Sequence, residues 1–478
     1  MIGAFAPVQS PKKGFNNMSE TTKRSTGQHQ VKRDSFTSSL GMMAATLGSA
    51  VGLGNIWKFP SMTGTNGGAT FLFVYLACTI VVGLPVMISE IMLGRTVKAN
   101  AITTFNKLSP KKQPWGLVGV AGVVAAFLIL CFYTEVAGWV FAYIFKGISG
   151  SILTTDPKVA SDMFGQLISN PLMSLVWQWI VLVLISFIVT FGVSKGIEKV
   201  TTKLMPILFC LLVIVGIRSM TLPGASEGLK FLFAPDFSKI SGTVILMAMG
   251  LAFFKLSIGM GTMMTYGSYC RDDQNVPMTA TKVMLADLMV SLLAGIAIFP
   301  AVFAYGFDVT AGPSLLFVTI PAVFASMPFG YLFAIIFFVL AAIASTGAML
   351  SLFEVPVAYL SETKQMSRKG AVITTALGIV ILGAPAALSH SLTADVTIFG
   401  KTFFDLFDFL SSNIFMPAGG LCICIFTGWV FGKDRIREQL SNIGKLNNGG
   451  IISLFTVLVK YVSPILVALV LLNMLNVF

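Results

Sequence analysis

Two glycine-rich stretches interrupt long apolar runs of this 478-residue chain. The first is Gly48-Ser-Ala-Val-Gly-Leu-Gly-Asn55 and the second is Leu256-Ser-Ile-Gly-Met-Gly261. Glycine weakens a helix, and unwound backbone inside a membrane is tolerated only where it lines a protein cavity. The amide groups that a break exposes bind carboxylates well. The two stretches therefore predict a ligand site made largely of main chain, with close helix packing through glycine as the simpler alternative.

Residues for enzymatic chemistry are scarce. The chain has two histidines, His29 in a polar segment and His390 near the end of an apolar run. An enzyme in the membrane needs a nucleophile with a base, or a metal cluster. Of the six cysteines, Cys422 and Cys424 are two residues apart on an apolar run without further metal-binding partners, which favours simple packing. No phosphate-binding Gly-x-x-x-x-Gly-Lys-Ser/Thr loop is found, which argues against ATP-driven transport. The sequence predicts a protein that is not an enzyme.

The composition is that of a membrane protein. Hydrophobic residues make up 55% and charged residues 11%, with a mean hydropathy of +0.85, whereas soluble proteins carry about 25% charged residues. The net charge is +12. The basic residues lie between apolar runs, so they indicate membrane topology rather than a nucleic-acid partner.

Eleven apolar runs are long enough to cross a bilayer, which takes about 20 residues. All-helical structure is expected, because strands of a β-barrel are much shorter. The runs lie near 38–65, 67–95, 116–147, 173–193, 199–220, 240–269, 279–307, 328–360, 370–390, 403–432 and 452–476.

The distribution of lysine and arginine predicts the orientation. Residues 1–36 are polar and basic, show no cleavable signal peptide, and are expected to form a disordered cytoplasmic tail. The loop after the second run holds Arg95, Lys98, Lys107, Lys111 and Lys112, and later loops on the same side are also basic. The N-terminus is therefore predicted to be cytoplasmic, and eleven spans place the C-terminus outside.

The two glycine breaks fall in the first and sixth runs, five spans apart. Because five is odd, a second five-span unit enters the membrane from the opposite side, which is typical of inverted-repeat transporters with a site at two broken helices. We expect a transporter domain over 37–478, with one repeat at 37–220, the second at 240–432, and an extra helix at 452–476.

At these residues the sequence resembles the neurotransmitter:sodium symporter family, with the fold of the bacterial leucine transporter. The resemblance covers about 33–478, and some bacterial members of the family have eleven helices. It depends on five motifs: Ala50-Val-Gly-Leu-Gly-Asn-Ile-Trp-Lys-Phe-Pro60 with Asn66-Gly-Gly-Ala, Glu90-Ile-Met-Leu-Gly-Arg95, Phe132-Tyr-Thr-Glu-Val-Ala-Gly-Trp139, Phe253-Phe-Lys-Leu-Ser-Ile-Gly-Met-Gly261, and Thr265-Tyr-Gly-Ser-Tyr269.

The resemblance implies an amino-acid site between the two breaks. The substrate carboxylate would meet the first break, from Ala50 through Gly52 and Leu53 to Gly54, with a hydroxyl hydrogen bond from Tyr133. The ammonium would meet carbonyls near Ser49, Phe254 and Ser257, and Phe254 would cap the pocket. Ile129, Met260 and Leu352 would line the side-chain end. This apolar lining, with a flexible methionine, favours a neutral aliphatic or aromatic amino acid.

The first sodium site of the family is altered. Its ligands correspond to the Ala50 carbonyl, the Asn55 side chain, a helix 6 position that is Lys255 here, and a helix 7 position that is Asp287. A buried lysine needs a partner or loses its proton. We expect the Lys255 ammonium to replace this sodium, to pair with Asp287 and to face the substrate carboxylate. The alternatives are a lysine that couples transport to protons, and one that reaches the interface without function.

The second sodium site is also altered. The resemblance assigns the carbonyls of Gly48 and Val51 and two helix 8 hydroxyls as its ligands. Strict spacing puts the hydroxyl positions at Gly347 and Ala348, whereas Ser345 and Thr346 lie two residues earlier. A local gap would restore the site and strict spacing would remove it. Chloride is not expected, because Asp287 supplies a fixed negative charge.

Two charge pairs correspond to the gates of the family. Lys58 and Asp408 match the outer pair, and Arg33 and Glu362 match the inner pair, with Tyr269 nearby and Phe36 replacing a tryptophan. Such ion pairs suit alternating access. An ion pair contributes little to stability while water surrounds it, and more when the closed gate buries it.

The resulting expectation is a multi-pass protein of the bacterial inner membrane that transports an amino acid, coupled to sodium at one site. Its partners would be the amino acid and membrane lipid, and its oligomeric state is left open. Open alternatives are proton-coupled or sodium-independent transport, and a non-transporting sensor of the same fold. A channel would show polar rings or a filter motif, which the sequence lacks.

Overall fold

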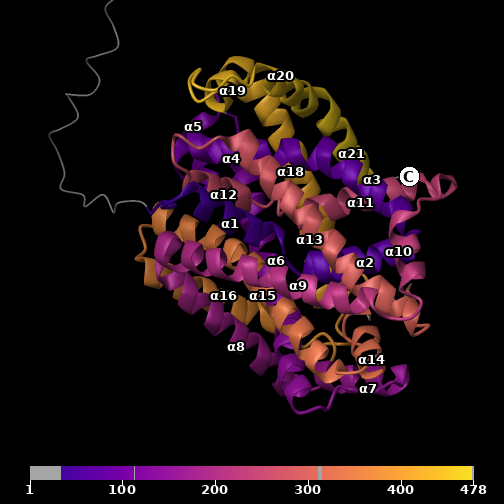
Figure 1. Cartoon of the computed structure of the whole chain (residues 1–478). Helices are drawn as coiled ribbons and strands as arrows, with labels where there is room; N and C mark the ends of the chain where they lie inside the picture. Colours follow the sequence, from indigo (N-terminus) through magenta and orange to yellow (C-terminus); the bar gives the residue numbers. More distant parts are fainter. Residues whose placement is uncertain (1–33, 112, 310–314, 476–478) are drawn as a thin grey trace, which may run out of the picture. The chain divides into compact units, whose positions relative to one another are not determined.

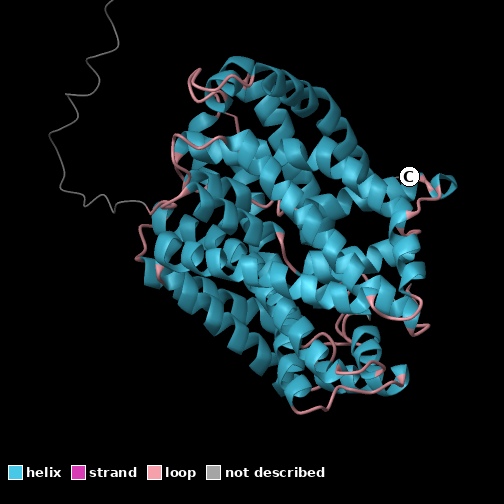
Figure 2. Cartoon of the chain, viewed as in Figure 1, coloured by secondary structure: helices cyan, strands magenta, loops and turns pink. Residues whose placement is uncertain are grey.

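The computed structural model describes residues 34–111, 113–309 and 315–475, and within them the regular secondary structure is helical (Figure 2). The helices that make up the apolar runs follow the chain in the order shown in Figure 1. They are α1 (Ser39–Ala50), η1 (Gly54–Lys58), α2 (Phe59–Thr65), α3 (Ala69–Cys78), η2 (Thr79–Gly83), α4 (Leu84–Val97), α6 (Gly116–Ile148), α8 (Pro171–Thr190), η3 (Val193–Glu198), α9 (Lys199–Met220), α11 (Gly242–Lys255), α12 (Thr262–Ser268), α13 (Val276–Ala304), α15 (Gly330–Thr363), α16 (Arg368–Ala387), α17 (Phe403–Asp408), η6 (Phe409–Phe415), α18 (Met416–Ile425), η7 (Phe426–Phe431), α20 (Gly449–Val457), η8 (Leu458–Val462) and α21 (Ser463–Met474).

Shorter helices lie between these spans. They are α5 (Ala101–Leu108), α7 (Pro157–Ile168), α10 (Ala225–Phe233), η4 (Phe237–Lys239), α14 (Thr319–Ala325) and α19 (Lys433–Leu440). Several begin at a side-chain cap. Asn100, for example, accepts a hydrogen bond from Thr103 N at 3.1 Å, which satisfies one of the free amides of the first turn.

Nine continuous helices of the described residues are long and apolar enough to cross a membrane. A tenth span consists of α1 followed by η1 and α2, bent by 49° at the break. The remaining predicted run, 240–269, contains α11 and α12, each too short to span by itself. The predicted all-helical membrane fold is therefore confirmed, and the described residues contain nine or ten of the eleven predicted spans as helices long enough to cross a membrane.

The two breaks have a local cause in the sequence. In the first, the Gly52 N–H, which would bond to the Gly48 carbonyl in a continuous helix, donates to Asn55 Oδ1 at 3.2 Å. In the second, Gly259 and Gly261 have φ angles of +80° and +77°, a region that glycine adopts without steric cost. Ser257 adopts φ +52° in the same break, which is uncommon for a residue with a Cβ atom.

The helices that carry the breaks lie inside the bundle. The first span contacts α15, α9 and α13, and α12 packs closely on α4 (Figure 1). A Cβ atom at Gly94 would lie 2.0 Å from the Met264 carbonyl oxygen, so glycine is required for the α4–α12 contact. These surrounding helices satisfy the condition that irregular backbone at membrane depth is enclosed by protein.

The start of the folded part differs from the expected boundary at residue 36. Phe36 is buried and makes edge-to-face contacts with Tyr266 and Tyr269. Its N–H donates to the Tyr269 carbonyl at 3.1 Å. The burial of Phe36 could not be predicted from the composition of the polar segment, because its aromatic partners are more than 200 residues away in the chain. Residues 1–33 of the expected tail lie outside the described residues.

Candidate functional site

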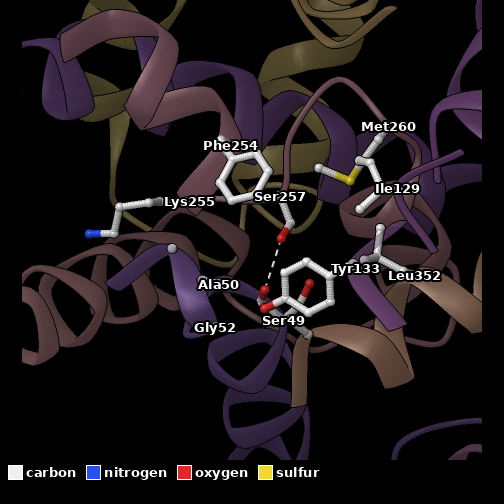
Figure 3. Close-up of a pocket in the computed structure, with 12 residues that line it drawn as sticks. Ser49, Ala50, Gly52, Ile129, Tyr133, Phe254, Lys255, Ser257, Met260 and Leu352 are labelled. Atoms are coloured by element: carbon white, nitrogen blue, oxygen red, sulfur yellow. Dashed lines mark hydrogen bonds between the residues drawn. The ribbon is translucent and has the colours of Figure 1, made fainter. Parts of the chain in front are cut away.

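A pocket lies between the two helix breaks (Figure 3). Its lining includes every predicted substrate-binding residue except Leu53, and it adds Ala348. The lining residues are Ser49, Ala50, Gly52, Gly54, Ile129, Tyr133, Phe254, Lys255, Ser257, Met260, Ala348 and Leu352. The structure thus brings together side chains from α1, α6, α11, the second break and α15.

The polar end of the pocket is formed by hydrogen bonds between the breaks and their neighbours. The Tyr133 hydroxyl accepts a hydrogen bond from Leu53 N at 2.9 Å, so Leu53 belongs to the site through its main chain. The Ser257 hydroxyl donates to the Ser49 carbonyl at 2.8 Å, which ties the second break to the first (Figure 3). Because the Tyr133 oxygen accepts from Leu53, its own proton is available to a ligand in the pocket.

The other end of the pocket is apolar. Ile129, Met260 and Leu352 lie together there, and Phe254 lies on another side of the same space (Figure 3). Ile129, Met260 and Leu352 are buried, and Phe254 is half-buried. A pocket with main-chain polar groups at one end and apolar side chains at the other fits a small amphiphilic ligand.

Next to the pocket, Lys255 lies in a buried network of polar side chains. Its Nζ atom is 3.2 Å from Asp287 Oδ2, and both side chains are fully buried. Nζ also donates to the Tyr75 hydroxyl at 2.8 Å and to the Ser291 hydroxyl. The Asn55 amide donates to Asp287 Oδ1 at 2.6 Å. These further hydrogen bonds offset the desolvation cost of the ion pair, as a buried ion pair requires.

The Lys255 side chain contributes to the pocket mainly through its carbon atoms. Its Cγ atom would lie 3.3 Å from a Cβ atom built on Gly54. Figure 3 shows its amino group pointing away from Tyr133 and Ser257. The structure therefore brings Lys255 to Asp287, but it does not direct the ammonium into the pocket as the expected contact with a substrate carboxylate requires.

The residues assigned to a second cation site lie between α1 and α15. A Cβ atom at Gly347 would be 2.6 Å from the Gly48 carbonyl oxygen, and one at Gly52 would be 3.0 Å from Ala348 Cβ. Gly347 and Ala348 therefore face the first break. Ser345, one turn before Ala348, and Thr346 donate their hydroxyls to the Ala342 carbonyl at 3.0 and 2.7 Å. Their oxygens keep acceptor capacity for a cation.

The outer charge pair is brought together by the fold. Lys58 Nζ is 3.8 Å from Asp408 Oδ1, and it lies 4.0 Å from the centroid of the Phe254 ring. Both charged side chains are about one-third exposed, at 33% and 39%. The pair therefore lies next to Phe254, between the pocket and the solvent.

The inner charge pair is only partly covered by the described residues. Arg33 lies outside the described residues. The carboxylate of Glu362 accepts from Asn100 N at 2.7 Å and from its side-chain amide at 3.0 Å. Tyr269 donates its hydroxyl to Glu354 Oε1 at 2.7 Å, and Arg368 binds the same buried carboxylate through two nitrogens.

Glu354 and Glu90 are functional candidates that the sequence reasoning did not single out. Glu90 is buried on α4, and its carboxylate accepts from Gly259 N at 2.5 Å and from Met264 N at 3.3 Å. It therefore binds the amides freed by the second break. The signal in the sequence was an acidic residue within an apolar run, which costs energy unless it is paired.

Comparisons with known proteins agree with this geometry. The model of the sodium:neurotransmitter symporter family matches residues 33–156 and 166–478. The chain belongs to the sodium:neurotransmitter symporter family. It is therefore a multi-pass membrane transporter and not an enzyme. Both conclusions agree with the predictions from the sequence.

Individual members of this family are similar over nearly the whole chain. An uncharacterized sodium-dependent transporter of Bacillus subtilis is 40% identical over 442 residues, which cover 92% of this chain and 98% of the relative. An uncharacterized sodium-dependent transporter of Haemophilus influenzae is 34% identical over 449 residues, covering 92% and 97%. The crystal structure of MhsT in complex with L-phenylalanine superposes with a TM-score of 0.85 at 41% identity, covering 92% of this chain and all of MhsT.

Proposed function

We propose that this symporter carries a neutral hydrophobic or aromatic amino acid across the bacterial inner membrane, driven by sodium at one site. The observation that carries the proposal is the pocket between the two breaks, with main-chain polar groups at one end and Ile129, Met260 and Leu352 at the other. The L-phenylalanine bound by MhsT and the names of the sodium-dependent relatives support it.

The amino acid would lie with its carboxylate against the first break. Amides freed there carry partial positive charge, and the Tyr133 hydroxyl proton completes the contact. The ammonium would meet carbonyls at the ends of α1 and α11, including that of Ser49, which already accepts from Ser257. Phe254 and the Lys58–Asp408 pair would close the pocket from outside.

In this proposal the Lys255 ammonium supplies the positive charge of the first sodium. It neutralises Asp287, which would otherwise attract a cation, and Asn55 is held by the same carboxylate. A tethered charge is not released with the substrate, so the number of transported sodium ions falls by one. Because Asp287 already balances the positive charge of Lys255, the proposal includes no chloride ion.

The remaining sodium would bind between the first break and α15. The Gly48 carbonyl has lost the Gly52 N–H as its helical partner, and the Val51 carbonyl lies at the end of α1. Ser345 lies one turn from Ala348, which contacts the break, so its hydroxyl is the better placed of the two candidates. Oxygen ligands of this kind suit a hard cation.

The membrane arrangement belongs to the proposal as well. The basic loops support a cytoplasmic N-terminus. Residues 37–220 and 240–432 would form the two inverted repeats, each opening with a broken helix, and residues 452–476 the extra helix.

Uptake of radiolabelled L-phenylalanine into proteoliposomes tests this function. We expect accumulation with an inward sodium gradient and little accumulation when potassium replaces sodium. Equal uptake in both buffers would favour a proton-coupled or sodium-independent transporter. Binding without any uptake would favour a sensor.

Replacing Tyr133 by phenylalanine is expected to weaken substrate binding about 10- to 100-fold, because a hydrogen bond to a charged group contributes roughly 1.5–3 kcal/mol. The change also removes the acceptor for Leu53 N. Thermal stabilisation by L-phenylalanine over a concentration series measures the affinity. The exposed Tyr461→Phe variant serves as the control, and equal affinities of the two variants would exclude Tyr133 from the site.

Replacing Ser345 by alanine is expected to raise the sodium concentration needed for half-maximal stabilisation by at least about 10-fold, because one oxygen ligand of the cation is lost. The matched control is Ser326→Ala, whose hydroxyl likewise donates to a helix carbonyl, at the end of α14. An unchanged sodium dependence in the Ser345 variant would rule out this hydroxyl and leave Thr346→Val as the next variant to measure.

A further inference from the structure

Glu135 is a buried carboxyl group in the membrane that the transport scheme above does not use. It lies on α6, two residues after Tyr133, and is fully buried. Neither of its carboxyl oxygens has a hydrogen-bond partner among the described residues. An ionisable side chain at this depth normally pairs with another group or marks a functional site. An ionised carboxylate without partners costs several kcal/mol, so this group is held as the neutral acid.

Two further buried polar atoms on α6 and α8 also lack a hydrogen-bond partner among the described residues. Gln178 on α8 donates to the Cys131 carbonyl at 3.2 Å and to the Thr134 hydroxyl at 3.3 Å, but its Oε1 atom is buried and unbonded. Oε1 is an acceptor, as a protonated carboxyl requires. The indole N–H of Trp139, one helical turn after Glu135, is also buried and unbonded. It is a donor, as an ionised carboxylate requires.

This face of α6 is covered by α17, the helix that carries Asp408 of the outer charge pair. Phe132 and Trp139 both contact the ring of Phe404, with centroids 5.4 and 6.0 Å apart. Glu135 lies between them on α6, three residues after the first and four before the second, so it shares their side of the helix. Phe404 belongs to α17, and Asp408, one turn later on that helix, pairs with Lys58.

Few other charged groups face this site. On the outer side of the bundle, His390 follows α16 and contacts Trp139 and Phe404. Asp405 and Asp408 lie on α17. From α8 the polar neighbour is Gln178, and the outer half of α15, residues 330–346, contains no acidic or basic residue.

We propose that Glu135 is a proton-binding site coupled to the outer gate. When Lys58 and Asp408 separate and α17 moves away from α6, the carboxyl group meets water and releases its proton to the outside solution. When the gate closes over a substrate, Glu135 takes one proton back from that solution. The proton does not cross the membrane in this scheme, and the O–H bond of the Glu135 carboxyl group is the one covalent bond that forms and breaks. This inference rests on the proposed function, because it assumes that substrate binding closes the Lys58–Asp408 side.

The scheme fixes the direction of the pH dependence. Closing with substrate bound requires protonated Glu135, so the apparent affinity for substrate rises as the external pH falls. The dependence reaches at most a 10-fold change in dissociation constant per pH unit, which corresponds to one proton. A purely structural neutral acid would bind no proton on closure and would give no such dependence.

The test is titration calorimetry of the purified full-length protein with L-phenylalanine in sodium buffer. Repeating it in two buffers with different heats of ionisation gives the number of protons taken up per substrate bound. We expect up to one proton for the wild type and none for Glu135→Gln, which mimics the neutral acid. The Glu227→Gln variant, altered at an exposed acid of α10, should take up as many protons as the wild type.

The outcomes separate the two claims. No binding heat and no thermal stabilisation with any amino acid would contradict the proposed function itself. Binding without proton uptake by the wild type would overturn the role of Glu135, and so would unchanged uptake by Glu135→Gln. If Glu135→Gln does not fold, Glu135→Met supplies a second neutral side chain, and the wild-type measurement alone still decides whether a proton is bound.

Discussion

Replacing Lys255 by methionine is expected to lower the stability of the folded protein by about 3–5 kcal/mol, because it leaves Asp287 buried without its cation. Methionine is similar in length and shape to lysine, so the loss of stability reports on the missing charge. Asp287 is fully buried, and after the change it would keep hydrogen bonds from Asn55 and Tyr75. A free cation can replace the ammonium. We therefore expect the variant to regain much of its stability in sodium and to require one more sodium ion for substrate binding.

Thermal unfolding in detergent, measured in sodium and in potassium buffer, checks this expectation. The double variant Lys255→Met with Asp287→Asn removes both charges and should recover most of the stability without added sodium dependence. Lys230→Met, at an exposed lysine of α10, should have little effect. If the single Lys255 variant were as stable as the wild type in potassium, the ion pair would have no role in holding this site.

Replacing Arg368 by alanine is expected to lower the stability of the folded protein by about 3–5 kcal/mol, because it leaves the buried Glu354 carboxylate without its cation. Arg368 binds both oxygens of the buried Glu354 and donates to the Val189 carbonyl at 3.0 and 2.8 Å. These contacts link α15, the start of α16 and the end of α8. Without the guanidinium, Glu354 keeps Tyr269 as its one hydrogen-bond donor among the described residues. Because Tyr269 follows the second broken helix directly, we also expect slower transport in this variant.

An exposed arginine provides a matched control for that experiment. Arg271 pairs with Asp273 at 2.8 Å, but the two side chains are 51% and 65% exposed. Exposed pairs contribute about 0–1 kcal/mol, so Arg271→Ala should melt close to the wild type. Equal melting temperatures of the Arg271 and Arg368 variants would show that the Glu354 pair behaves as a surface contact.

Much of the pocket could be predicted from sequence, because its walls depend on motifs that are local in the chain. The glycines of each break allow the helix to unwind there, and Phe254, beside the second break in the sequence, lines the resulting pocket. Ala348 was not predicted as a lining residue. A small apolar side chain on a long apolar helix does not indicate which face of the helix it lies on. Its place in the pocket follows from the packing of α15 against the first break.

The charge networks were harder to predict than the pocket. Lys255 was expected to reach Asp287, because two opposite charges in neighbouring spans have few other partners. The direction of the ammonium was not accessible, since it depends on Tyr75 and Ser291 as well. Glu354 and Arg368 are 14 residues apart, in the last third of α15 and at the start of α16, and the chain must turn back before they can meet.

The number of sodium ions carried per amino acid tests the account most directly. It can be measured in proteoliposomes as the ratio of the initial fluxes of radioactive sodium and radioactive L-phenylalanine. With Lys255 as a resident cation, the account predicts one sodium ion per amino acid. A ratio of two would contradict it, because both sodium sites would then be working, and a ratio of zero would show that sodium does not drive this symporter.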